Sequence, residues 1–147
     1  MKLIPLLLLA VCASCRTISH VEDARTIEGV VRAQEAAWNR GDVEGYMSEG
    51  YLRSPELTFF SGGSVTRGYD PVLARYSQRY KSDGKEMGRL TFADLEVLTL
   101  TEDVALVRGR WDLDFENQQD VGGLFSLILR RTQAGWRIVH DHTSVDD

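Results

Sequence analysis

Two histidines stand two residues apart near the C-terminus, in the segment Trp136-Arg137-Ile138-Val139-His140-Asp141-His142. Side chains alternate between the two faces of a β-strand, so both histidines share a face with Trp136 and Ile138. Those apolar neighbours predict that the imidazoles point into the protein. There a neutral His140 could donate or accept a proton. Asp141 is then expected to face away from both, which excludes a local His–Asp pair.

A pair of inward imidazoles could also bind a metal ion, but a protein site needs three or four ligands. The sequence shows no inward carboxylate beside them, and its two cysteines, Cys12 and Cys15, lie at the other end of the chain. We therefore expect no metal and no cofactor. The structural alternative for the pair is one buried, hydrogen-bonded histidine and one histidine in solvent at the strand end.

The helices that would position these residues can be read from caps and periodicity. Ser19-x-x-Glu22 predicts a capping box, so a first helix is expected from about His20 to a terminating glycine, Gly41. Asp42 is expected to cap a short second helix rather than to act as a base. Asp70-Pro71 predicts the start of a third helix, with Asp70 as its cap.

The rest of the chain reads as strands. A hairpin is expected at 57–67, turning at Gly62-Gly63, and longer strands at 90–100, 104–115, 123–131 and 136–144. Helices followed by a four-strand meander predict an α+β fold, with the helices on one face of a curved antiparallel sheet.

Strand 123–131 is apolar on both faces, because Phe125 and Leu127 alternate with Leu124 and Ile128. Helices on one side of a sheet need only one apolar face. The second apolar face therefore predicts that another copy of the chain covers it, in a homodimer.

Residues 1–15 read as a targeting segment rather than as part of the fold. Met1-Lys2 precedes an apolar run, 3–11, that is too short to span a bilayer as a helix. Ala13-Ser14-Cys15 is similar to the end of a bacterial lipobox. We therefore expect export, with Cys15 lipidated and the domain of residues 20–147 anchored in the cell envelope on the periplasmic side. The alternative is cleavage after Ala13, which yields a periplasmic or secreted protein.

Composition and charge limit the classes of partner that the protein is expected to bind. The chain has 147 residues, 43% of them hydrophobic and 27% charged, which suits one globular domain. Its formal net charge is −5 and it has no cluster of Lys and Arg. Nucleic-acid binding is not expected, because phosphate contacts need concentrated positive charge. Cys15 would be the only cysteine of the mature chain, which excludes an internal disulfide.

Four features together resemble one family: residues 37–42, Gly68, residues 109–111 and the C-terminal segment 136–144. They are similar to the SnoaL-like and calcium/calmodulin-dependent protein kinase association-domain-like branch of the nuclear-transport-factor-2-like superfamily. The resemblance implies a cone-shaped curved sheet wrapped around the N-terminal helices, with a central cavity. It also implies dimerisation through the outer face of the sheet. Because relatives include isomerases, dehydratases, cyclases and non-catalytic domains, the fold leaves the function open.

In such a cone the cavity would be lined by large apolar residues and by the two histidines. Each aromatic residue could equally be plain core, but as a set they favour a small apolar or aromatic ligand. Tyr51 and Arg67 are expected near the cavity mouth. Apolar residues at the inward positions of the central strands make an anionic ligand unexpected. The predicted ligand-binding residues are Trp38, Tyr46, Tyr51, Phe59, Tyr76, Trp111, Phe125, Leu127, His140 and His142.

Three functions remain open from the sequence. The first is an exported protein that binds a small molecule. The second is a cofactor-independent enzyme for proton transfer, cyclisation, dehydration or hydrolysis, with His140 as base and Tyr46 as hydrogen-bond donor. The third is a dimeric interaction domain whose cavity is vestigial. A tyrosine, a histidine and a carboxylate converging on one point would favour the enzyme.

Overall fold

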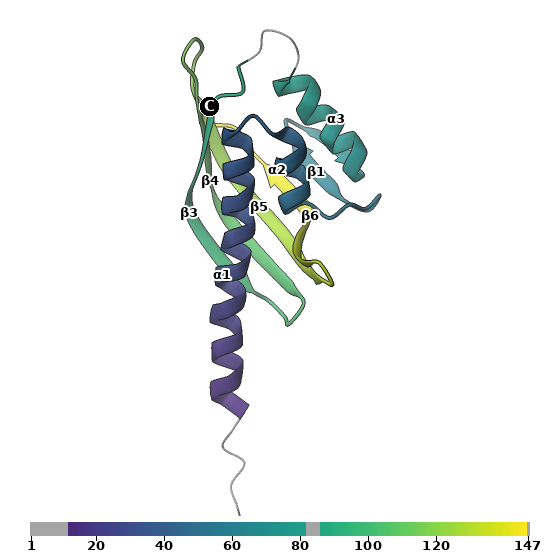
Figure 1. Cartoon of the computed structure of the whole chain (residues 1–147), viewed down its shortest axis with the longest axis vertical. Helices are drawn as coiled ribbons and strands as arrows, with labels where there is room; N and C mark the ends of the chain where they lie inside the picture. Colours follow the sequence, from purple (N-terminus) through teal and green to yellow (C-terminus); the bar gives the residue numbers. More distant parts are fainter. Residues whose placement is uncertain (1–11, 82–85, 147) are drawn as a thin grey trace, which may run out of the picture.

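Three helices and one six-stranded sheet make up the computed structural model, which describes residues 12–81 and 86–146, with side chains from His20 onward (Figure 1). Helices α1 and α2 pack on one face of the sheet, and α3 lies beside α2 and the β1–β2 hairpin. The elements are α1 (Cys12–Asn39), α2 (Val43–Gly50), β1 (Thr58–Ser61), β2 (Ser64–Arg67), α3 (Tyr69–Tyr80), β3 (Arg89–Thr99), β4 (Val104–Asp114), β5 (Val121–Thr132) and β6 (Gly135–Thr143).

The strand order in the sheet is β2-β1-β6-β5-β4-β3. The predicted α+β class is confirmed, and the four long strands lie within two residues of their expected bounds. One feature of the sheet was not expected: β1 pairs with β6 in parallel, while the other neighbouring strands are antiparallel. The sheet is therefore mixed, because β6, the last strand of the meander, lies next to β1 and runs in the same direction.

Two helix starts differ from the expected ones. Helix α1 is described from Cys12 onward, so Ser19 lies inside the helix and not at its N-terminus. The segment 12–19 contains neither glycine nor proline to stop the helix. Helix α3 begins at Tyr69 after Gly68, so Asp70 is not its cap. The buried side chain of Tyr69 belongs to the first turn, and the cap of this helix, Gly68, lies two residues before the expected one.

The expected signal segment is described only in part. Residues 1–11 and the side chain of Cys15 lie outside the described residues. Within the described residues, no helix has the length and apolarity needed to cross a bilayer.

The joint between α1 and α2 is as expected. Gly41 has a φ of +77°, and its N–H and that of Asp42 donate to the carbonyls of Trp38 and Ala37, a Schellman motif. Asp42 caps α2 by accepting a 2.7 Å hydrogen bond from the N–H of Gly45. The resulting sharp turn brings the Tyr46 ring to 5.2 Å from the Trp38 ring.

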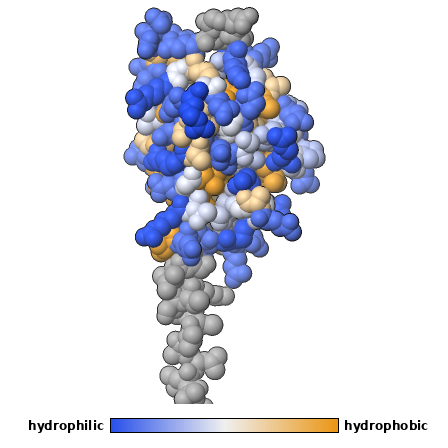
Figure 2. All heavy atoms as spheres, viewed as in Figure 1, coloured by the Kyte–Doolittle hydropathy of each residue, from blue (hydrophilic) through white to orange (hydrophobic). Residues whose placement is uncertain are grey.

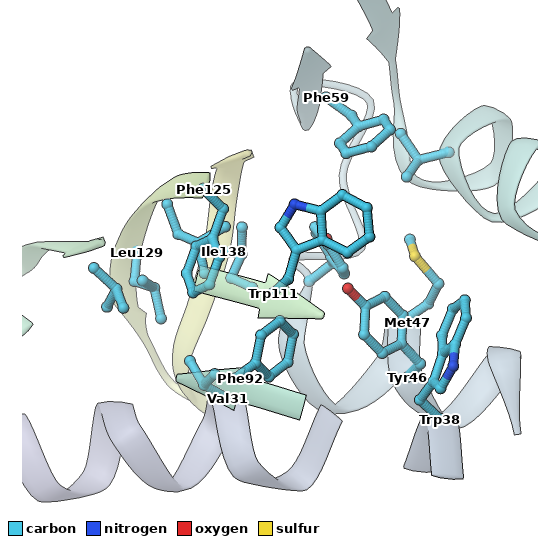
Figure 3. Close-up of a cluster of buried hydrophobic side chains, with 14 of the residues drawn as sticks. Val31, Trp38, Tyr46, Met47, Phe59, Phe92, Trp111, Phe125, Leu129 and Ile138 are labelled. Atoms are coloured by element: carbon cyan, nitrogen blue, oxygen red, sulfur yellow. The ribbon is translucent and has the colours of Figure 1, made fainter. Parts of the chain in front are cut away.

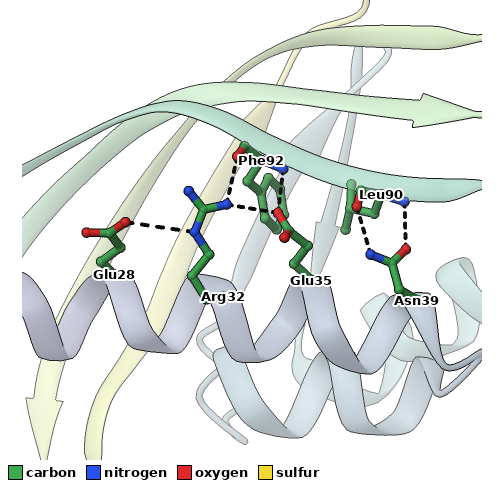
Figure 4. A network of polar contacts seen from close by, with 6 residues as sticks. All are labelled: Glu28, Arg32, Glu35, Asn39, Leu90 and Phe92. Carbon is green, nitrogen blue, oxygen red and sulfur yellow. Dashed lines mark hydrogen bonds and ion pairs between the residues drawn. The ribbon is translucent and has the colours of Figure 1, made fainter.

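Helix α1 also holds the edge strand β3 through side chains spaced along one face (Figure 4). Asn39 exchanges two 2.8 Å hydrogen bonds with the backbone of Leu90. At Phe92, the N–H donates to Glu35 and the carbonyl accepts from Arg32. These contacts satisfy backbone groups that an edge strand would otherwise expose.

The core lies between the helices and the inner face of the sheet. Figure 3 shows Phe92, Trp111 and Phe125 of the sheet facing Tyr46, Met47 and Trp38 of the helices. On β4 the inward face is the predicted one, with Val107, Trp111 and Leu113 buried. In the view of Figure 2 the surface is mainly hydrophilic, with small separate hydrophobic areas.

Candidate functional site

A cavity of about 80 Å³ lies between the helices and the inner face of the sheet. We call it the aromatic cavity, because aromatic rings from both the helices and the strands line it. It is lined by all of the predicted aromatic residues and Leu127, and not by His140 or His142. The wall of the cavity includes Trp38, Tyr46, Tyr51, Phe59, Tyr76, Tyr80, Trp111, Phe125, Leu127, Asp141 and Thr143, together with Ser61, Arg75 and Arg79.

The rings of the wall are held in edge-on and tilted contacts. Tyr76 of α3 lies 5.3 Å from the ring of Tyr46 and 5.5 Å from that of Phe59. The indole N–H groups of Trp38 and Trp111 donate to the carbonyls of Gly88 and Ser144. Both indoles are thus fixed by backbone contacts, and they present apolar ring surface to the cavity.

Strand β6 does not follow the simple alternation from which the histidines were expected to point inward. Leu129 of β5 pairs with Ile138, but the residue before it on β5, Ile128, pairs with His140. Val139 is therefore the extra residue of a β-bulge, and a bulge shifts every following side chain to the other face. Trp136 and Ile138 point inward as expected; beyond the bulge the inward residue is Asp141, and His140 is not.

The two histidines lie on the opposite face, beside β1. His140 Nδ1 is 2.6 Å from the hydroxyl of Thr58, and both imidazoles contact the ring of Phe60. Partial burial, and then the neighbouring His142, lower the pKa of His140. The expectation that His140 and His142 face the cavity is wrong, and so is the expectation that Asp141 faces away from it.

Asp141 is the carboxyl that the sequence did not reveal in the cavity wall. It is 3% exposed, and it accepts hydrogen bonds from the hydroxyls of Tyr51 at 2.5 Å and Thr143 at 2.7 Å. Burial raises its pKa to about 6, although both hydroxyl donors oppose that shift. A carboxyl of this kind can hold or release a proton near neutral pH.

Three tyrosines surround that carboxyl. Burial raises the pKa values of Tyr46, Tyr51 and Tyr76, and the charge of Asp141 raises them further. All three hydroxyls therefore remain protonated at neutral pH and can donate hydrogen bonds. In Figure 3 the hydroxyl of Tyr46 points toward Trp111, into the space between the helices and the sheet.

Two cations line the cavity, and both come from α3 rather than from the sheet. Arg75 donates to the hydroxyl of Thr66 and to the carbonyl of Ser61, and its guanidinium lies 5.0 Å from the ring of Phe59. Arg79 lies 5.3 Å from the ring of Tyr80. Arg67, which was expected at the mouth, is exposed on β2 and does not line the cavity.

One sequence signal could have pointed to Asp141. Thr143 lies two positions after Asp141 on the same strand. The two side chains therefore share a face of the strand, whichever face points into the cavity. The bulge itself has no such signal, because Val139 and His140 are neither glycine nor proline. Within the described residues, no group of three or more His, Cys, Asp or Glu side chains gathers as metal ligands would.

Comparison with known proteins agrees with this architecture. The SnoaL-like domain family matches residues 27–147. An NTF-2 like protein of unknown function from Shewanella oneidensis MR-1 is 36% identical, with a TM-score of 0.75 over 82% of this chain and 97% of that chain. No curated protein matches the chain.

Two more distant structures share the fold. A ketosteroid isomerase-like protein from Erwinia carotovora atroseptica SCRI1043 is 19% identical, with a TM-score of 0.69 over 86% of this chain and 98% of that chain. A putative calcium/calmodulin-dependent protein kinase type II association domain from Thiobacillus denitrificans ATCC 25259 is 18% identical, with a TM-score of 0.66 over 82% and 94%. With the family match and the helices packed on one face of the sheet, the chain belongs to the SnoaL-like domain family and has the nuclear-transport-factor-2-like fold.

Proposed function

We propose that this protein binds a small, flat, largely apolar molecule in the aromatic cavity. The observation that carries the proposal is the convergence of rings from both helical and sheet elements around one space whose described wall contains a single carboxyl, Asp141. Apolar walls with a few placed polar groups are typical of small-molecule sites.

The size of the cavity limits the ligand. A volume of about 80 Å³ is well below the several hundred Å³ of common ligand pockets. A single ring can enter only if part of the wall moves. The half-buried rings of Tyr76 and Tyr80, on α3, are the parts of the wall most free to do so. A one-ring or two-ring molecule is therefore the expected ligand.

Native mass spectrometry of protein purified from its own host tests the proposal. A small molecule should be retained by the wild type and lost in Leu127→Phe, which fills the cavity from β5. Ile128→Phe is the matched control, because the next residue on the strand faces the other side of the sheet. If folded wild type retains nothing, or if both variants retain the molecule equally, the binding proposal fails and a vestigial cavity is favoured.

A second function is favoured by the position of Asp141 at the wall of a largely apolar cavity, where its pKa is raised to about 6. Ionised Asp141 could take a proton from carbon α to a carbonyl and return it elsewhere, while Tyr46 donates a hydrogen bond to the carbonyl oxygen. Asp141 replaces His140 as the candidate base, because the bulge turns His140 out of the cavity.

Isomerisation of 3-cyclohexen-1-one to the conjugated enone tests this chemistry, because the product absorbs in the ultraviolet. We expect acceleration by the wild type, none by Asp141→Asn, and wild-type rates for His140→Ala. An equal rate for wild type and Asp141→Asn would remove Asp141 from an acid/base role.

We also propose that the protein is exported, anchored through Cys15 and dimeric. The apolar run of residues 3–11 before Ala13-Ser14-Cys15 supports export and anchoring. On the outer face of β5, Leu124 is 58% exposed, and Ile128, on the same face of the strand, is half-buried. A partner that covers this face would remove both side chains from water.

A further inference from the structure

We propose that the molecule bound in the aromatic cavity is an organic carboxylate, with its anionic group held by Arg75 and Arg79 and its ring inside. This inference rests on the proposed binding function and specifies its ligand class. Both arginines lie on α3 one helical turn apart, so they share a face of the helix, and both line the cavity.

Both arginines bring a positive charge to the wall of the cavity. Among the described residues no carboxylate forms an ion pair with Arg75 or Arg79. Two guanidiniums at a cavity fit an anionic ligand.

The donors needed to hold a carboxylate are present. A guanidinium has five N–H donors, and Arg75 uses two of them, on Thr66 and Ser61. The guanidinium of Arg79 lies 5.3 Å from the ring of Tyr80, and among the described residues it forms no hydrogen bond or ion pair. Burial raises the pKa of Tyr80, and the charges of Arg79 and then Arg75 oppose the rise.

The charges also orient the ligand. A carboxylate beside Asp141 would be repelled once that buried group ionises, whereas the same carboxylate beside Arg75 and Arg79 is attracted. The anionic end of the ligand therefore lies at α3. A neutral hydroxyl or carbonyl is the group expected to face Asp141 and Tyr51.

Matched pairs of probes test this inference: benzoate against benzamide, and 2-naphthoate against 2-naphthamide. Each pair differs in charge and shares its ring. Binding is followed by NMR through the indole N–H signals of Trp38 and Trp111, which line the cavity. We expect each acid to bind the wild type at least about tenfold more tightly than its amide, since charge-assisted hydrogen bonds are the stronger ones.

Two variants test whether the preference for acids over amides depends on Arg75 and Arg79. Arg79→Gln should abolish most of the preference for acids while leaving amide affinity unchanged. Arg75→Lys, which keeps a positive charge beside Thr66 and the carbonyl of Ser61, should reduce the preference because an ammonium cannot form the two-pronged contact. Arg67→Gln is the matched control, because it removes the same charge from a nearby residue that does not line the cavity.

The possible outcomes separate the carboxylate inference from the binding function. If acid and amide shift the indole signals with equal affinity, the cavity binds small molecules but the carboxylate inference is overturned. If Arg79→Gln and Arg67→Gln lower the preference equally, the effect is general electrostatics and the inference is also overturned. If no probe of either pair binds at millimolar concentration, the binding function and the inference fail together.

Discussion

The hydroxyl of Tyr51 donates a 2.5 Å hydrogen bond to Oδ2 of Asp141, across 90 residues of sequence. Tyr51 directly follows α2, and it forms a parallel bridge with Ile138 of β6. The adjacent N–H of Leu52 donates to the carbonyl of Ile138 at 2.9 Å. This short segment therefore ties the helical layer to β6 and fixes the carboxyl that faces the cavity.

Asp141 should make the stability of the protein fall as pH rises. Its pKa is raised to about 6 in the folded chain, above the value of 3.8 for a free carboxyl, so between these values the folded state binds more protons than the unfolded state. The stabilisation is complete below pH 4 and is lost as pH rises through 6. At about 1.4 kcal/mol per pH unit, the loss is roughly 3 kcal/mol.

Asp141→Asn should remove this dependence, because an amide does not ionise. Urea unfolding at pH 4 and pH 7 measures it: the difference between the two pH values should be smaller in Asp141→Asn than in wild type. Asp114→Asn, at an exposed position on β4, is the control and should keep the wild-type difference. Equal pH dependence in Asp141→Asn and wild type would show that Asp141 titrates normally.

Tyr51→Phe should destabilise the protein and raise the pKa of Asp141 further. The substitution removes a donor from a buried carboxyl, at a cost of about 1–3 kcal/mol, and the hydrogen bond from Tyr51 is the largest of the contributions that lower that pKa. Carbon-13 NMR titration of the Asp141 carboxyl measures the pKa directly.

Tyr69→Phe serves as the control for Tyr51→Phe, since Tyr69 is equally buried but does not line the cavity. It should leave the titration of Asp141 unchanged. An unchanged titration in Tyr51→Phe would contradict the hydrogen bond as the source of the effect.

Cys15→Ser should release the protein from membranes. If Cys15 is acylated, the wild type should partition with the membrane fraction, because two or more acyl chains anchor a protein stably. Cys12→Ser is the matched control and should remain membrane-bound. A wild-type protein that is already soluble and begins at Ser14 would instead support cleavage after Ala13.

Ile128→Asp should yield monomers if the outer face of the sheet is a dimer interface. In a two-fold interface each substitution occurs twice, so one buried charge per chain is doubly unfavourable. Sedimentation velocity at micromolar concentration measures the assembly state. A wild-type monomer under these conditions would contradict the dimer, and Thr91→Asp, at an exposed position on the edge strand β3, controls for added charge.

The sequence by itself determined the features that depend on local physics. Gly41 and Asp42 end one helix and begin the next because glycine accepts a positive φ and aspartate accepts from free helix N–H groups. On β4 the alternation of apolar residues correctly separated the buried Trp111 from its outward neighbours, since regular pairing preserves the alternation. The aromatic wall of the cavity could be predicted from the aromatic residue types together with the cone shape that the family resemblance implies.

Only the tertiary structure decided which group of β6 faces the cavity. The bulge at Val139 arises from the pairing of β6 with β5, and it leaves no mark in residue types, so Asp141 and His140 exchange the faces that alternation assigns to them. The parallel pairing of β1 with β6 and the approach of Arg75 and Arg79 to the cavity are equally non-local. Each depends on contacts between segments far apart in the chain, and local periodicity contains no information about such contacts.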